Sequence, residues 1–179
     1  MKKSIILITG GPGFGKTKLA ERLSETGYRV GGEVARELIA EQQEAGGDVL
    51  PWKNLAAFQR EVLDRRLAFY HAVPEGEIAF SDRGIPDQLA FSRYKGFSAP
   101  KILITAAQEY RYFPVVFVAP PWKDIYRQDE IRTETYDEAS HLHDVICKTY
   151  VDFGYQLVDL PKVEVEGRVK FIKNYITEL

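Results

Sequence analysis

Cysteine is nearly absent from the chain. Cys147 is the single example, so an intramolecular disulfide is excluded, and such sparse use of cysteine fits a reducing compartment. We interpret Cys147 as a small buried apolar residue of a helix and not as a nucleophile. Long hydrophobic runs are also missing, since no stretch approaches the roughly 18 apolar residues of a membrane span. The apolar run after Lys3 is too short for a signal peptide and leads into glycines, so we expect a cytoplasmic protein.

The chain also lacks an excess of either charge. Its 24 Lys and Arg residues nearly balance 26 Asp and Glu residues, for a net charge of −2. Proteins that hold nucleic acid by bulk charge are strongly basic, so we expect no nucleic-acid partner. The 179 residues, 45% of them hydrophobic and 28% charged, suit an ordinary globular chain with one full-sized core. We therefore predict one domain over residues 1–179.

Short apolar runs alternate with longer amphipathic stretches, which is typical of an α/β domain with a parallel sheet. The predicted strands are 4–9, 28–33, 77–81, 114–119 and 155–160. The predicted helices are 16–26, 34–45, 54–73, 86–94, 100–110, 135–153 and 165–176. Thr135 and Glu138 form a capping-box pattern at the start of the sixth helix. This order predicts a doubly wound, five-stranded parallel sheet.

Ligands bind such sheets at the carboxyl ends of their strands. The residues that fall there are Gly10, Glu33, Asp82, Ala119 and Pro161. We expect these residues to converge on one cleft.

The first strand ends in a phosphate-binding loop. Residues 10–17 read GGPGFGKT and match the pattern G-x-x-x-x-G-K-[ST] without a mismatch. Glycines allow successive backbone N–H groups to point at phosphate oxygens, and the following helix aims its N-terminus at the same place. The alternative, a glycine-rich turn with an incidental lysine, does not explain why the strand and the helix flank the motif as required. The residues expected to hold a nucleoside triphosphate are Gly11, Pro12, Gly13, Phe14, Gly15, Lys16, Thr17 and Lys18.

Two side chains of this loop carry specific chemistry. Lys16 supplies a mobile cation for the β- and γ-phosphates, and the Thr17 hydroxyl is a ligand for Mg²⁺. Pro12 has no N–H group and stiffens the loop without donating. ATP and Mg²⁺ are therefore the expected cofactors, with ATP only weakly preferred to GTP.

The third strand ends in Asp82, followed by Arg83 and Gly84. A P-loop enzyme needs a carboxylate on a neighbouring strand to hold the hydrated metal or to take a proton. We assign that role to Asp82, expect Arg83 to contact phosphate or substrate, and expect Gly84 to free the turn. The alternative is that Asp82 caps the next helix and that Arg83 is solvated.

Two further polar residues leave alternatives open. Glu33, at the end of the second strand, could take a proton from a substrate hydroxyl. It could equally be a first-turn glutamate favoured by the helix dipole, with Arg36 as its surface partner. Gln59 could read the edge of a planar ligand, but a solvated position on the third helix is the favoured interpretation.

Pro120, Pro121 and Trp122 break the chain, and the segment 123–134 that follows is charged and poorly periodic, which is typical of an exposed loop. A solvated charged loop without a role is one interpretation, and a lid over residues 120–134 is the other. We predict that this segment forms a lid over the nucleotide and that Arg127 and Arg132 contact the phosphates. His141 and His143 lie two apart on a helix, so they should diverge and make a poor metal pair. The predicted catalytic residues are Lys16, Glu33, Asp82, Arg83 and Arg132, and the predicted metal ligands are Thr17 and Asp82.

Several segments together resemble one family. They are residues 10–17, 32–36 (GEVAR), 51–52 (PW), 81–84 (SDRG) with Pro86 and Asp87, 110–112 (YRY), 119–122 (APPW) and 129–134. The sequence resembles the predicted P-loop ATPases of the NadR-like AAA group, whose relatives include nicotinamide riboside kinase domains and, more remotely, deoxynucleoside and thymidylate kinases.

The resemblance implies a nucleotide-kinase-like core with a lid. It also implies that Glu33 and Asp82 match the acidic positions of the kinases, and that Arg132 matches a lid arginine. The deoxynucleoside kinases carry Glu-Arg-Ser where this chain has Asp82, Arg83 and Gly84.

Three functions remain open from the sequence. The first is a kinase that transfers the γ-phosphate to a small hydroxylated, nucleoside-like acceptor, or a related ATPase. The second is a nucleotide-dependent switch or sensor with slow hydrolysis, although the guanine motif Asn-Lys-x-Asp is missing. The third is an AAA motor subunit, which is disfavoured because the chain ends soon after the last strand. Neither the acceptor nor the oligomeric state is predicted.

Overall fold

A computed structural model describes residues 4–131 and 133–178 of the chain. Its centre is a five-stranded sheet in the order β2-β3-β1-β4-β5, and every pair of neighbouring strands is parallel. The strands are β1 (Ser4–Thr9), β2 (Arg29–Gly31), β3 (Ile78–Asp82), β4 (Val115–Val118) and β5 (Gln156–Asp159). The predicted doubly wound parallel sheet is confirmed.

The second strand is shorter than the predicted 28–33. Its pairing with β3 covers three residues, from Arg29 opposite Ala79 to Gly31 opposite Ser81. Glu33 lies beyond the strand and is the N-cap residue of the next helix. This shortening places the Glu33 side chain at the carboxyl edge of the sheet instead of within it.

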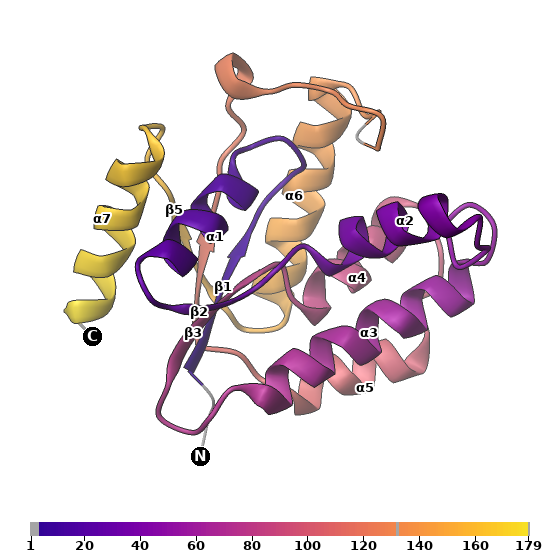
Figure 1. Cartoon of the computed structure of the whole chain (residues 1–179), viewed down its shortest axis with the longest axis horizontal. Helices are drawn as coiled ribbons and strands as arrows, with labels where there is room; N and C mark the ends of the chain where they lie inside the picture. The colour runs from indigo at the N-terminus through magenta and orange to yellow at the C-terminus, as the bar shows by residue number, and fades with distance from the viewer. Residues whose placement is uncertain (1–3, 132, 179) are drawn as a thin grey trace.

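Helices cover both faces of the sheet (Figure 1). They are α1 (Lys16–Glu25), α2 (Val34–Ala45), α3 (Leu55–Ala72), α4 (Ile85–Tyr94), α5 (Lys101–Glu109), α6 (Tyr136–Asp152) and α7 (Val165–Thr177). In Figure 1, α1 and α7 lie to the left of β1, and the helices α2 to α6 lie to its right. The predicted capping box starts α6, because the Thr135 N–H donates to Glu138 Oε2 at 2.7 Å and the Glu138 N–H donates to Thr135 Oγ1 at 3.2 Å.

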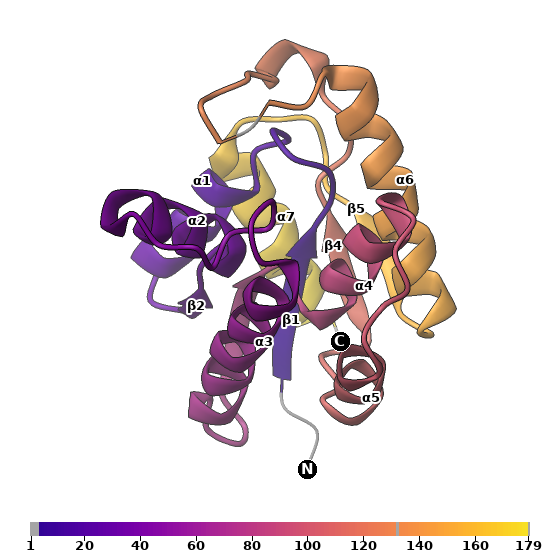
Figure 2. The same cartoon turned by 90° about the vertical axis from the view of Figure 1, so that its right-hand side faces the viewer.

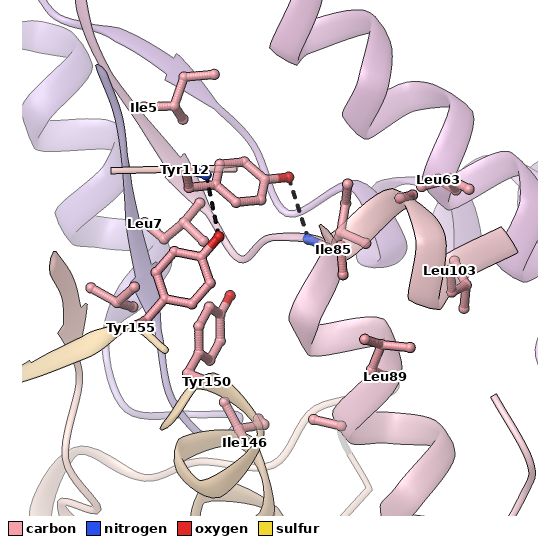
Figure 3. Close-up of a cluster of buried hydrophobic side chains, with 14 of the residues drawn as sticks. Ile5, Leu7, Leu63, Ile85, Leu89, Leu103, Tyr112, Ile146, Tyr150 and Tyr155 are labelled. Carbon is pink, nitrogen blue, oxygen red and sulfur yellow. Dashed lines mark hydrogen bonds between the residues drawn. The ribbon is translucent and has the colours of Figure 1, made fainter. Parts of the chain in front are cut away.

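The central strand divides the core into two parts, since successive side chains of a strand point to opposite faces. Ile5 and Leu7 pack with α3, α4, α5 and α6, whereas Ile6 and Ile8 pack with α1 and α7. Figure 3 shows the first part, in which tyrosine side chains also satisfy backbone groups. Tyr112 Oη accepts from the Ile85 N–H at 3.3 Å, and Tyr155 Oη accepts from the Tyr112 N–H at 3.2 Å.

The connection between β4 and α6 contains one short 3₁₀ helix, η1 (Lys123–Ile125). The Tyr126 hydroxyl donates to the Glu134 carbonyl and closes the segment on itself. Figures 1 and 2 place this connection, the β1–α1 loop and the β5–α7 connection at one end of the molecule. Among the described residues, no helix is long and apolar enough to cross a membrane.

Candidate functional site

The glycines of the β1–α1 loop adopt the backbone conformations that the motif requires. Gly10, Gly13 and Gly15 have φ angles of 127°, 82° and 87°, which L-residues with side chains rarely adopt. Gly11 is required for another reason, because a Cβ atom there would lie 2.4 Å from the Ala139 carbonyl oxygen. The loop is therefore wedged against the start of α6.

A histidine from α6 holds one N–H group of this loop. The Gly11 N–H donates to His143 Nδ1 at 3.3 Å, so it is already engaged within the protein, and its contact with a phosphate stays a prediction. Burial lowers the pKa of His143, which keeps the acceptor nitrogen unprotonated near neutral pH. His141 is exposed and packs beside Tyr94, so the predicted divergence of the two histidines is confirmed.

Cys147 lies next to this histidine, with Sγ 3.5 Å from His143 Nε2. The thiol is half-buried, and burial raises its pKa to about 12. A thiol with that pKa carries almost no thiolate at neutral pH, and the thiolate is the nucleophilic form. Cys147 is therefore a packing residue, as expected.

The ring of Phe14 turns away from the phosphate side of the loop. It is fully buried and lies about 6 Å from the rings of Tyr126, Tyr136 and His143, at centroid distances of 6.1, 6.0 and 6.0 Å. The Phe14 carbonyl accepts from Arg168 Nη1 at 2.9 Å. Any contact between Phe14 and a nucleotide would therefore involve its backbone.

A cavity of about 630 Å³ opens beside the loop. Six of the residues predicted to bind the nucleotide line it: Gly13, Gly15, Lys16, Thr17, Lys18 and Arg127. The buried residues Gly11, Pro12 and Phe14 are not among the lining residues. A cavity of this size is typical of a small-ligand site.

Lys16 is buried at the end of the loop, with 5% of its surface exposed. Its ammonium donates to the Gly11 carbonyl at 2.7 Å. Burial and the nearby Arg83 guanidinium lower the pKa of Lys16 to about 8. Burying the charged ammonium of Lys16 away from water costs free energy. An anionic ligand beside it would compensate this desolvation and stabilise the charged form.

A second cavity, of about 270 Å³, lies at the ends of β2 and β3. Its lining includes Thr17, Glu33, Arg36 and Asp82. Asp82 is 2% exposed, and within the described part of the chain neither carboxylate oxygen has a hydrogen-bond partner. Burial and the Glu33 carboxylate raise the pKa of Asp82 to about 7.

This second cavity fits a magnesium ion shared with phosphates. Mg²⁺ is usually held by one or two protein oxygens together with water and substrate phosphates. Thr17 and Asp82 offer a hydroxyl and an unsatisfied carboxylate to one cavity. The described residues contain no group of three or more His, Cys, Asp and Glu side chains that could hold a metal by themselves, so the ligand set would be completed by the nucleotide.

Arg83 is buried between the carboxyl ends of β1 and β3. It has a φ of 72°, a conformation that costs a non-glycine residue about 1–3 kcal/mol. The Arg83 N–H donates to the Ile8 carbonyl at 2.9 Å, and Nη1 donates to the Gly10 carbonyl at 3.0 Å. With 3% of its surface exposed, Arg83 is not the solvated residue of our alternative interpretation.

The turn after β3 also differs from the prediction. We expected Gly84 to supply the unusual backbone angles, but Arg83 has the positive φ and Gly84 is extended, at φ −142°. A glycine is required at position 84 because there is no room for a side chain: a Cβ atom there would lie 2.6 Å from Leu7 Cδ1. Asp87, and not Asp82, caps α4, since the Gly84 N–H donates to Asp87 Oδ2 at 2.8 Å.

Asp87 is a central residue of the site that we did not assign from the sequence. It is fully buried and also accepts from Thr9 Oγ1 at 2.6 Å, Tyr150 Oη at 2.5 Å and Arg83 Nη1 at 3.2 Å. An acid three residues after Gly84, in the first turn of a helix, is a capping signal that could have revealed it. Its contacts fix the Arg83 side chain beside the phosphate loop.

The structure bears on one part of the alternative interpretation of Glu33, its pairing with Arg36. Glu33 Oε1 accepts from Arg83 Nε at 3.4 Å, whereas Arg36 pairs with Asp129 at 2.6 Å. The proposed surface pair of Glu33 with Arg36 is thus replaced by two other ion pairs. The Glu33 side chain is 16% exposed and faces the second cavity.

Gln59 is 9% exposed, so the favoured solvated position on α3 is wrong. Its side-chain oxygen accepts from Gln88 Nε2 at 2.7 Å.

The two arginines predicted for the charged segment differ in outcome. Arg127 lines the larger cavity, and Arg132 lies outside the described residues.

Comparison with known proteins agrees with this geometry. A family model described as an AAA domain matches residues 5–168. The chain belongs to this AAA domain family. Among curated proteins, none matches the sequence. The match covers the phosphate loop, both strand-end carboxylates and the connection after β4.

Solved kinases have the same fold. Deoxyadenosine kinase from M. mycoides with bound dATP has a TM-score of 0.63 and 18% identity, over 97% of this chain and 99% of the kinase. The same enzyme with dCMP and dCDP has a TM-score of 0.59 and 15% identity, over 98% and 100%. Thymidylate kinase from Ehrlichia chaffeensis has a TM-score of 0.60 and 14% identity, over 98% and 100%. The fold is therefore that of nucleotide kinases, as predicted.

Proposed function

We propose that this protein is a magnesium-dependent kinase that transfers the γ-phosphate of ATP to a hydroxyl group of a small, nucleoside-like acceptor. The observation that carries the proposal is the unsatisfied Asp82 carboxylate in the cavity shared with Thr17. A buried acid without a partner is costly, and perturbed acids in clefts cluster at functional sites. A metal bound to phosphates would compensate that cost.

The triphosphate would occupy the loop, with Lys16 at the β- and γ-phosphates. Lys16 would exchange its hydrogen bond to the Gly11 carbonyl for phosphate oxygens. Thr17 and Asp82 would hold the magnesium ion, whose positive charge would offset the negative charge of the phosphates. The pKa of Lys16 is lowered in the ligand-free protein. We expect it to rise when the triphosphate binds, because an opposite charge favours the protonated form.

Glu33 is the residue that we assign to the acceptor. It is more exposed than Asp82 and faces the same cavity. As the acceptor oxygen attacks the γ-phosphorus and the bond from that phosphorus to the bridging oxygen breaks, the hydroxyl proton would pass to Glu33. Arg83, fixed by Asp87 and Gly10, would hold Glu33 in position and offset the developing negative charge.

We include residues 120–134 in the proposal as a lid. Its Arg127 lines the nucleotide cavity, and its Asp129 pairs with Arg36 of α2. One ion pair therefore links this segment to α2, whose Arg36 lines both cavities. Closing such a segment excludes water, which favours transfer to the acceptor over hydrolysis.

The test is ADP production from MgATP with a panel of nucleosides, nicotinamide riboside and small sugars. One acceptor should raise the rate at least tenfold above basal hydrolysis, and Lys16→Ala should abolish this stimulation. Glu33→Gln should remove the stimulation while nucleotide binding persists, because its role concerns the acceptor. Lys170→Ala, an exposed lysine on α7, is the matched control and should behave as wild type.

Other results would contradict the proposal in distinct ways. If nucleotide binds but no acceptor changes a slow basal turnover, the alternative function of a nucleotide-dependent switch or sensor is favoured. If Glu33→Gln retains full acceptor stimulation, the assignment of the proton acceptor is wrong.

A further inference from the structure

The larger cavity has a polar end and an apolar end. Lys16, Thr17 and Lys18 line it near the phosphate loop, whereas Trp122, Ile125 and Val163 contribute apolar surface to its lining. Ile125 is 37% exposed and Val163 is 43% exposed. Large apolar side chains left open on two separate connections, after β4 and after β5, form a surface that an apolar ligand group could cover.

An arginine without a complete set of partners lies among these residues. Arg168 of α7 is 2% exposed and lines the same cavity. Its Nη1 donates to the Phe14 carbonyl at 2.9 Å and its Nε donates to the Pro161 carbonyl at 2.9 Å, but Nη2 has no partner within the described residues. Leaving a buried donor unsatisfied is costly, so a ligand acceptor at Nη2 would be favourable.

The guanidinium of Arg168 is held rigidly. Two carbonyls, one in the phosphate loop and one in the β5–α7 connection, fix its plane, and the Trp122 ring lies 5.1 Å from its central carbon. The indole is itself oriented, since Trp122 Nε1 donates to Asp124 Oδ2 at 3.3 Å. Proteins bind nucleobases by stacking on an aromatic ring and by hydrogen bonds to the edge of the base. The Trp122 ring and the fixed Arg168 guanidinium offer one of each.

We propose that Trp122 and Arg168 form the binding site for the base of the donor nucleotide, and that this site selects purines. The base would pack against the Trp122 indole, and Arg168 Nη2 would donate to the purine N7 atom. Adenine and guanine both present N7 as an acceptor, and pyrimidines have no such atom. The site therefore accepts ATP and GTP alike and disfavours UTP and CTP. This inference rests on the proposed function only in its use of a nucleoside triphosphate.

The test compares dissociation constants for ATP, GTP, UTP, 7-deaza-ATP and inorganic tripolyphosphate, each with Mg²⁺, by titration calorimetry. ATP and GTP should bind about tenfold more tightly than UTP, which corresponds to about 1.4 kcal/mol. 7-Deaza-ATP, which lacks the N7 acceptor, should bind about fivefold more weakly than ATP. Trp122→Ala should remove the advantage of ATP over UTP and leave tripolyphosphate binding unchanged.

A matched control is available because the chain has one other tryptophan. Trp52 is 61% exposed in the turn between α2 and α3, and Trp52→Ala should leave every dissociation constant unchanged. In a Trp52→Phe background the remaining indole also reports directly on the site. Its fluorescence should change with ATP and stay constant with tripolyphosphate.

The inference is overturned if UTP binds as tightly as ATP, if 7-deaza-ATP equals ATP, or if Trp122→Ala weakens tripolyphosphate as much as ATP. In the last case Trp122 merely supports the phosphate loop. None of these results requires an acceptor, so the base site can fail while the kinase proposal stands. Conversely, purine selectivity without acceptor-stimulated turnover would support the base site and contradict the kinase. If no triphosphate binds, both proposals fail.

Discussion

Replacing the buried acid of the site should stabilise the protein without ligand. Asp82→Asn keeps the shape of the side chain and removes a charge that has no hydrogen-bond partner among the described residues. The pKa of Asp82 lies at about 7, against an ordinary value of 3.8. Each unit of this difference corresponds to about 1.4 kcal/mol, so the ionised carboxylate would cost up to about 4 kcal/mol at pH 8. Water entry and relaxation reduce this cost, and we expect a gain of about 2 kcal/mol.

The stability gained by Asp82→Asn relative to the wild type should increase as the pH rises. Because the pKa of Asp82 is higher in the folded state, the folded protein binds more protons than the unfolded chain between about pH 4 and pH 7. The stability of the wild type therefore decreases as the pH rises through this window, and this contribution is absent from Asp82→Asn. The difference between the two proteins should be largest near pH 8 and should vanish near pH 4.

Thermal unfolding in EDTA from pH 4 to pH 8 measures this difference. For a chain of this length, about 2 kcal/mol raises the melting temperature by about 4 to 8 °C. Asp159→Asn is the matched control, since Asp159 is an exposed carboxylate at the end of β5 and should show no such gain. A melting temperature of Asp82→Asn that is equal to or below that of the wild type at pH 8 would refute the reasoning. So would a gain that is constant with pH.

Three further substitutions test the residues that hold the phosphate loop, Arg83 and the start of α6 in place. Asp87→Asn should cost about 3 kcal/mol in urea unfolding, because an amide cannot satisfy all the donors around this buried acid, including Arg83; a loss below about 1 kcal/mol would contradict this. Gly11→Ala should lower the melting temperature and abolish nucleotide binding, because its Cβ would lie 2.4 Å from the Ala139 carbonyl; unchanged binding would show that the loop adapts. Thr135→Ala should cost about 1 kcal/mol by removing the N-cap of α6, measured in the same urea titration, and a neutral effect would mean that packing alone fixes this helix end.

Local features of the site were predictable because they depend on neighbours in sequence. The GGPGFGKT loop between a strand and a helix predicted unusual backbone angles at its glycines, and Gly10, Gly13 and Gly15 adopt a positive φ whereas Gly11 does not. The spacing of Thr135 and Glu138 predicted the start of α6. Strand ends predicted that Glu33 and Asp82 would share a cavity, because parallel strands place their carboxyl ends at one edge of the sheet. Gly10, Ala119 and Pro161, which we expected in the same cleft, line neither of the two cavities described above.

Contacts between distant segments were not predictable in the same way. His143 reaches Gly11 from 132 residues away, and Arg168 reaches Phe14 from 154 residues away. An arginine three residues after Val165 and four before Ile172 sits on the apolar stripe of α7, and that position is the one local signal that Arg168 is buried. Periodicity identifies the inward face of a helix, but it does not identify the partner across the interface.

The sequence by itself determined the fold class, the phosphate loop and the edge of the sheet where the acids lie. Hydrophobic periodicity and glycine stereochemistry act over a few residues, so they are readable along the chain. Only the tertiary structure decided that Arg83 is buried, that Asp87 and not Asp82 caps α4, and that Trp122 lies over Arg168. Burial and its pKa consequences arise when packed elements exclude water, and which polar groups then meet is set by the three-dimensional arrangement of all of them.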